Sequence, residues 1–174
     1  MKLVTLLWII FLACLMAGVY GILHDQLTYT ISHEYYTKFK FYQFRIAQYG
    51  DEAILNQPRL YVARVGFLAT WWTGVPIGLV LGLVGLVHKD HKSMFKVTIK
   101  ALMIALIVTF ITGLIGLTYG FTVLAESGVN WWLPDNLVQT KNFIAVGSMH
   151  NFSYLGGAVG MLVGIVYSVM KRNK

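Results

Sequence analysis

The sequence predicts an all-α membrane protein, a bundle of four transmembrane helices with a structured outer segment between the first and second helices. Apolar residues make up 57% of the 174-residue chain and charged residues only 12%, whereas about a quarter of the residues in soluble domains are charged. Four apolar runs reach the roughly 20 residues needed to cross a hydrocarbon layer. We therefore expect a single transmembrane domain over residues 1–174.

The connections between the predicted spans differ greatly in length. The segment 24–64, which follows the first span, is the one long polar stretch of the chain, whereas the second and third spans are joined by a short basic loop. The predicted spans cover about residues 3–23, 65–87, 97–124 and 143–170.

The positive charge of the chain lies on one side of the predicted membrane. If the N-terminus is cytoplasmic, the inner segments hold eight cations against one carboxylate, Asp90, and so carry the whole net charge of +7. The outer segments hold equal numbers of cations and carboxylates. Because cytoplasmic loops carry the excess of Lys and Arg, we expect a multi-pass protein of the bacterial inner membrane with both termini cytoplasmic. The basic inner loop then indicates attraction to the lipid bilayer rather than to nucleic acid.

Every predicted span carries small residues spaced so that they share one helix face. Because lipid is as apolar as leucine, close backbone packing at such faces is a main source of attraction between helices. The pattern predicts a tight bundle with glycine-zipper packing and leaves room for a homo-oligomer. The predicted packing residues are Ala13, Ala17, Gly21, Gly74, Gly78, Gly82, Gly113, Gly116, Gly120, Gly156, Gly160 and Gly164.

The outer segment begins with an alternating stretch. Residues 27–31 are mostly β-branched or aromatic, which favours a short extended piece, and Ser32 can cap a helix that follows. Aromatic residues then mix with Lys38 and Lys40, as in an element lying in the membrane interface with its cations above the rings. The alternation over 33–44 fits a strand as well as a helix. The predicted interfacial residues are Phe39, Phe41, Tyr42 and Phe44, with Trp131 and Trp132 after the third span.

The second span contains a proline and two tryptophans near its outer end. Pro76 removes one backbone hydrogen bond and predicts a kink. Trp71 and Trp72 lie about 10 Å deeper than Arg64 by helical rise. That is too deep for an interfacial belt, so we expect them to pack against the bundle or a ligand.

Four strings resemble those of a family of bacterial four-span membrane proteins, namely HDQLTYTIS, EYYTKFKF, ATWWTG and HNFSYLGG. The resemblance covers nearly the whole chain and implies the same four-span architecture. No activity is established for that family, so the resemblance implies neither a reaction nor a cofactor. The position of His33 is usually proline in the family, which speaks against His33 as an essential ligand.

Two histidines form the sharpest candidate site. At 1.5 Å per residue, His24 lies about 33 Å from Lys2 and His150 about 32 Å from Lys171, so both reach the same outer depth. They can meet if the first and fourth spans are neighbours. Ionisable groups at membrane depth are a functional hypothesis by default. The candidate ligand-binding or metal-binding residues are His24, Asp25, Glu126, His150 and Asn151.

Three interpretations of this site stay open. In the first, the protein is non-enzymatic and presents an outer site to a lipid, a small ligand or a protein partner, while the histidines tie the outer segment to the bundle. In the second, His24 and His150 hold haem or a transition metal in a redox protein, because imidazoles from facing helices are common ligands. In the third, His24 and Asp25 relay protons in a membrane enzyme acting on lipid or quinone. No motif identifies a catalytic residue.

Overall fold

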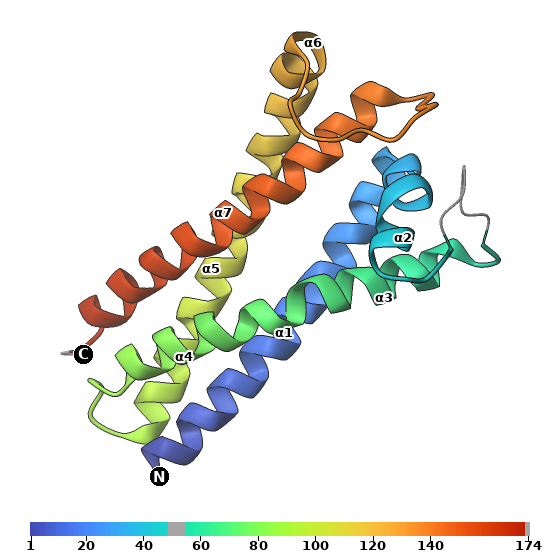
Figure 1. Ribbon diagram of the computed structural model, residues 1–174. Helices are drawn as coiled ribbons and strands as arrows, with labels where there is room; N and C mark the ends of the chain where they lie inside the picture. Colours follow the sequence, from blue (N-terminus) through green and yellow to red (C-terminus); the bar gives the residue numbers. More distant parts are fainter. Residues whose placement is uncertain (49–54, 173–174) are drawn as a thin grey trace.

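The computed structural model describes residues 1–48 and 55–172, and within these residues the chain is helical and contains no strand (Figure 1). Four helical segments are long and apolar enough to cross a membrane, which confirms the predicted all-α four-span class. These segments are Lys2–Ile31, Pro58–Gly85, His91–Ser127 and Thr140–Met170.

Two of these segments are single helices, and the other two change helical type along their length. The elements in chain order are α1 (Lys2–Ile31), the π-helix η1 (Tyr36–Lys40), α2 (Phe41–Gln43), α3 (Pro58–Thr70), the 3₁₀ turn η2 (Trp71–Thr73), α4 (Gly74–Gly85), α5 (His91–Tyr119), the π-helix η3 (Gly120–Leu124), α6 (Ala125–Ser127) and α7 (Thr140–Met170).

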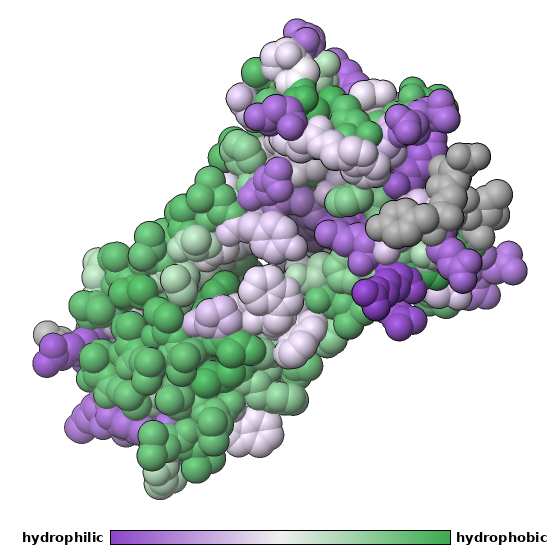
Figure 2. Space-filling model, viewed as in Figure 1, coloured by the Kyte–Doolittle hydropathy of each residue, from purple (hydrophilic) through white to green (hydrophobic). Residues whose placement is uncertain are grey.

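The spans pack as two antiparallel pairs. One pair is α5 with α7, and the other is α1 with α3 and α4; the pairs contact each other mainly through α1 and α5, α4 and α5, and α4 and α7. Figure 1 places both termini and the α4–α5 connection at one end, which we call the terminal end. The elements α2 and α6 lie at the opposite end, which we call the distal end. Figure 2 shows hydrophilic side chains gathered at both ends and apolar ones between them.

Glycines allow the backbones to approach within each pair. A Cβ at Gly21 would collide with the backbone of Gly66, and a Cβ at Gly66 with that of Gly21. In the other pair, a Cβ at Gly160 would meet the backbone of Ala105. All of the predicted packing residues are buried. Close packing of α1 on α3, and of α5 on α7, therefore depends on the missing side chains.

The predicted extended piece over residues 27–31 is wrong, because α1 continues through it to Ile31. The hydroxyls of Thr28 and Thr30 donate hydrogen bonds to carbonyls one turn earlier, at 3.1 Å and 3.0 Å. β-Branched residues thus stay helical here because their hydroxyls find acceptors within the helix. Ser32 then caps the next helix as predicted, since its hydroxyl accepts a hydrogen bond from the N–H of Tyr35 at 3.3 Å.

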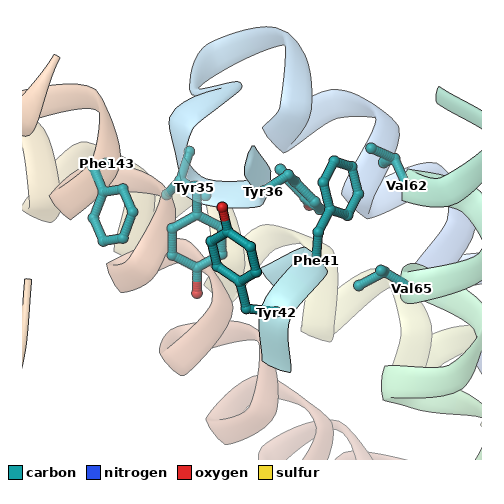
Figure 3. Close-up of a cluster of buried hydrophobic side chains, with 8 residues drawn as sticks. Tyr35, Tyr36, Phe41, Tyr42, Val62, Val65 and Phe143 are labelled. Carbon is teal, nitrogen blue, oxygen red and sulfur yellow. The ribbon is translucent and has the colours of Figure 1, made fainter. Parts of the chain in front are cut away.

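Residues 34–43, which we call the fold-back segment, are helical and turn back over the distal end. The two lysine side chains of this segment point into the protein. Lys38 and Lys40, expected to face the headgroups, are buried instead. Phe41 and Tyr42 are buried in a core that joins α3 to α7. Figure 3 shows Tyr35 beside Phe143 of α7, and Phe41 facing Val62 and Val65 of α3.

The second span changes geometry where Pro76 removes a backbone hydrogen bond. The 3₁₀ turn η2 separates α3 from α4 one turn before this proline, as expected when a helix loses an internal donor. Trp71 is 41% exposed and does not pack inside the bundle, contrary to our expectation. Trp72 is 52% exposed and does not pack inside the bundle either. Its Nε1 donates a hydrogen bond to the carbonyl of Ala69, and the side chain borders a pocket.

Candidate functional site

Asp25 lies at the centre of a buried polar cluster where α1 meets α7. Its Oδ1 atom is 3.2 Å from Nδ1 of His24 and 3.2 Å from Nε2 of His150. All three side chains are almost fully buried. Their ligand-type atoms lie within 4.8 Å of one another. The structure therefore brings together two histidines from opposite parts of the chain, with a carboxylate between them.

Each histidine has a protein oxygen on its other ring nitrogen. His150 Nδ1 lies 2.9 Å from the carbonyl oxygen of Val146, one turn earlier in α7. His24 Nε2 lies 3.1 Å from the hydroxyl of Ser153. Gly113 of α5 leaves room for this hydroxyl, because a Cβ there would collide with it. Both imidazole rings are thus held in a fixed orientation, with one nitrogen directed at Asp25.

The contacts of His150 require a proton or another cation between Nε2 and Asp25. A carbonyl oxygen can only accept, so Nδ1 of His150 carries a proton. In a neutral ring, Nε2 would then direct its lone pair at the carboxylate of Asp25, which is repulsive. The contact is attractive if His150 is an imidazolium, if the carboxyl of Asp25 carries the proton and donates it to Nε2, or if a cation lies between Nε2 and Asp25. His24 has no such constraint, because the hydroxyl of Ser153 can donate or accept.

The second carboxylate oxygen of Asp25 is an open hydrogen-bond acceptor. Oδ2 is buried and accepts no well-formed hydrogen bond from the residues that the structure describes, although the hydroxyl of Tyr36 interacts with the same carboxylate. The side chain is only 3% exposed. A buried polar atom without a partner costs about 1–3 kcal/mol. Such an atom is free to accept a hydrogen bond from a further group, whether a water molecule or a ligand.

Aromatic residues of the fold-back segment close the cluster from the distal side. The ring of Tyr35 stacks on that of His150, with centroids 4.9 Å apart. The hydroxyl of Tyr36 lies 2.6 Å from that of Thr28 on α1. Burial, and then the charge of Asp25, raise the pKa of both tyrosines well above the ordinary value. Both phenols are therefore neutral donors at physiological pH.

Lys40 places a buried ammonium near the cluster, over aromatic rings rather than against the carboxylate of Asp25. Its Nζ lies 5.6–5.8 Å from the ring centroids of Tyr35, Phe39 and Phe44. Burial lowers the pKa of Lys40, and the charge of Asp25 acts in the opposite direction. Cation–π contacts with three rings stabilise the ammonium in place of water.

Glu34 fastens the fold-back segment to the start of α7. Its carboxylate accepts hydrogen bonds from Lys38 Nζ at 2.7 Å, from the N–H of Val138 at 3.0 Å and from the N–H of Gln139 at 2.7 Å. Lys38 also donates to the carbonyl of Asn136 at 2.6 Å. Burial alone would raise the pKa of Glu34, but Lys38 and the two backbone donors outweigh it and lower the pKa.

A mostly apolar pocket of about 310 Å³ opens beside the cluster, between the two helix pairs. His24, Asp25 and His150 form its polar end. Its apolar wall draws residues from all four spans, among them Ala17, Trp72, Ile77, Leu106, Tyr154 and Met161. The pocket thus combines a wide apolar surface with a few converging polar groups, as small-molecule sites do.

The remaining candidates from the sequence lie elsewhere. Glu126 is exposed on α6 and is not part of the His–Asp group. Asn151 is exposed and borders a separate aromatic hollow with Trp131 and Trp132. Neither residue contributes to the cluster, because residue 126 follows the end of α5 at the distal rim and residue 151 faces another side of α7 than residue 150.

Haem held between the two histidines does not fit this geometry. The imidazole centroids are 4.7 Å apart and the rings are nearly perpendicular. In a haem with two axial histidines, the imidazoles lie on opposite faces of the porphyrin. Two iron–nitrogen bonds of about 2 Å, plus the distance from nitrogen to centroid in each ring, then place the centroids roughly 6 Å apart. Of the two cofactors considered for His24 and His150, haem and a transition-metal ion, only the metal ion fits.

The order Ser153, His24, Asp25 is that of a nucleophile, a base and an orienting acid. The distances of 3.1 Å and 3.2 Å suit hydrogen bonds along this chain. However, Ser153 lies in the interior of α7, where backbone N–H groups bond to carbonyls one turn earlier. The backbone around Ser153 therefore supplies no oxyanion hole, which acyl transfer uses for its largest stabilisation.

Sequence reasoning missed Tyr35, Tyr36 and Lys40 as neighbours of the cluster. Their contacts arise when residues 34–43 fold back, and helical periodicity does not encode this movement. Ser153 lies one turn after His150 in the same helix, and this spacing is a signal that could have found it. Thr28 lies one turn after His24 in α1, but the extended piece predicted for residues 27–31 concealed this spacing.

Comparison with protein-family models, with curated proteins and with solved structures finds no match for this chain.

Proposed function

We propose that this chain is a multi-pass protein of the bacterial inner membrane that binds a small amphipathic molecule taken from the outer leaflet. The polar group of that molecule contacts Asp25, and its apolar part fills the pocket between the helix pairs. Both termini are cytoplasmic in this proposal, because the distal end carries balanced charge and the terminal end carries the excess of Lys and Arg. The resemblance to the bacterial four-span family belongs to the same proposal, and the function is binding rather than catalysis.

The open acceptor Oδ2 of Asp25, at the polar end of an apolar pocket, is the observation that supports this function most directly. An unpaired acceptor selects a ligand that donates a hydrogen bond, such as a hydroxyl. The volume of about 310 Å³ is at the lower limit for ligand sites of roughly 300–1,000 Å³. It suits one ring or a short chain segment. The ligand class is thus a hydroxyl-bearing amphipath, for example a quinol or a monoacylglycerol.

The test measures the melting temperature of the purified protein with decylubiquinol or with monoolein. A ligand that binds the folded state alone raises the melting temperature, and the rise grows with the logarithm of the ligand concentration once this exceeds Kd. We expect one of these probes to stabilise the wild type by several degrees, and Gly157→Leu to abolish the shift. Gly157 borders the pocket and has no neighbour closer than 3.9 Å to an added Cβ, so a larger side chain enters the cavity.

Val159→Leu is the matched control, because Val159 is exposed on the same helix and its substitution leaves the pocket unchanged. Asp25→Asn tests the polar end, since an amide keeps the shape of the carboxylate but changes its acceptors. An equal shift in the wild type and in Gly157→Leu would disprove binding in this pocket.

A further inference from the structure

We propose that His24, Asp25 and His150 bind a divalent transition-metal ion at the polar end of the pocket. Two imidazole nitrogens and one carboxylate oxygen are the donor set of catalytic zinc sites and of non-haem iron(II) sites. This inference does not rest on which molecule fills the apolar part of the pocket.

The spacing of the donor atoms agrees with binding to one ion. Metal–ligand bonds of about 2.1 Å at tetrahedral angles place neighbouring donors about 3.4 Å apart. Asp25 Oδ1 lies 3.2 Å from each of the two inward nitrogens. A small outward shift of the side chains would create room for an ion between three donors that already face one another.

The outward nitrogens carry the hydrogen bonds that metal-binding histidines make. Such histidines donate their second N–H to an oxygen, which fixes the tautomer and the ring orientation. Val146 O accepts from His150, and the hydroxyl of Ser153 takes this position for His24. With both outer N–H groups engaged, both inward nitrogens present lone pairs to a cation.

A metal ion between these side chains would be attracted both by the carboxylate of Asp25 and by the lone pairs of the two inward imidazole nitrogens. The ammonium of Lys40 opposes a second cation nearby, but it lies over three aromatic rings, outside the donor set. A fourth coordination position would face the pocket, which the three ligands border.

The experiment strips the purified protein with a chelator and titrates it with Co²⁺, whose visible absorption reports the ligands. We expect one ion per chain and visible bands typical of tetrahedral cobalt. Asp25→Asn and His150→Gln should weaken binding at least 100-fold. Ser153→Ala keeps all three ligands and should weaken binding about 10-fold, the usual effect of losing an outer-shell partner. His33→Gln is the matched control, because His33 is an exposed histidine of the distal end.

Since a ligand variant could fail to fold, the wild type supplies a second measurement. Co²⁺ should raise its melting temperature, and the rise should persist in Gly157→Leu, whose donor set is intact. Absence of cobalt bands in the wild type, or full binding by Asp25→Asn, would overturn the inference. Labelling of Ser153 by a fluorophosphonate would overturn it as well, in favour of acyl transfer. If cobalt does not bind but the stripped protein still responds to the amphipathic probes, the metal inference alone fails and the proposed function stands.

Discussion

At the scale of single residues, Glu34 makes the stability of the distal end depend on pH. Its pKa is lowered in the folded protein, so the carboxylate stabilises the fold in full above the usual pKa of a glutamate. This stabilisation is lost as the pH falls through the lower pKa of the folded state. We expect the melting temperature of the wild type to fall in acid below about pH 4.5. Glu34→Gln should flatten this decline and cost about 3 kcal/mol at neutral pH, because Lys38 loses its buried partner.

Thermal unfolding measured between pH 3 and pH 7 checks this prediction. Asp135→Asn is the control, since Asp135 is an exposed carboxylate in the same loop before α7 whose backbone N–H groups bind Glu34. A decline in Glu34→Gln as steep as in the wild type would show that other carboxylates govern acid stability.

At the scale of helices, substitutions of two adjacent glycines of α7 can distinguish the effect of close helix packing from that of intrinsic helix propensity. A Cβ at Gly156 would lie 2.9 Å from the backbone of Thr109 and 2.8 Å from the side chain of Thr112 on α5. A Cβ at Gly157 would meet nothing closer than 3.9 Å. Gly156→Ala should therefore destabilise the protein by about 1–3 kcal/mol, as overpacked interfaces do. Gly157→Ala should be neutral or stabilising, because alanine favours the helix.

Unfolding of the two variants in the same detergent, by heat or by denaturant, measures this difference. Since each replacement adds one methyl group to the same helix, lipid and propensity effects cancel in the comparison. Equal stabilities would mean that α5 and α7 can separate slightly without loss.

At the scale of the whole molecule, the orientation in the membrane can be tested with introduced cysteines. Lys92 and Ser127 are exposed at the terminal and distal ends, respectively. In a chain with Cys14→Ala, an impermeant maleimide added to spheroplasts should label Ser127→Cys. It should label Lys92→Cys only after the membrane is opened, because the basic end is retained in the cytoplasm.

Gel-shift of the two cysteine variants before and after permeabilisation provides the measurement. Labelling of Lys92→Cys in closed spheroplasts would reverse the proposed orientation. The cluster at Asp25 would then take its ligand from the cytoplasmic leaflet.

The parts of this protein that follow from local sequence are the spans and the positions of the site along them. Hydropathy over about 20 residues identifies a spanning helix, and a constant rise of 1.5 Å per residue places His24 and His150 at one depth. Both properties belong to a single helix and need no knowledge of its neighbours. For the same reason Ser153, one turn from His150, could be identified from its spacing.

Only the tertiary structure decided how these residues meet. The contact of His24 and Asp25 with His150 requires α1 to approach α7, although each of these helices packs mainly on another partner. The inward turn of Lys38 and Lys40 depends on Glu34 and on the aromatic core between α3 and α7. An interfacial pattern and a buried aromatic core have the same composition, so the sequence alone could not separate them. The physical reason is that burial of a polar segment depends on partners distant in the chain, whereas apolar helices are selected by the membrane one at a time.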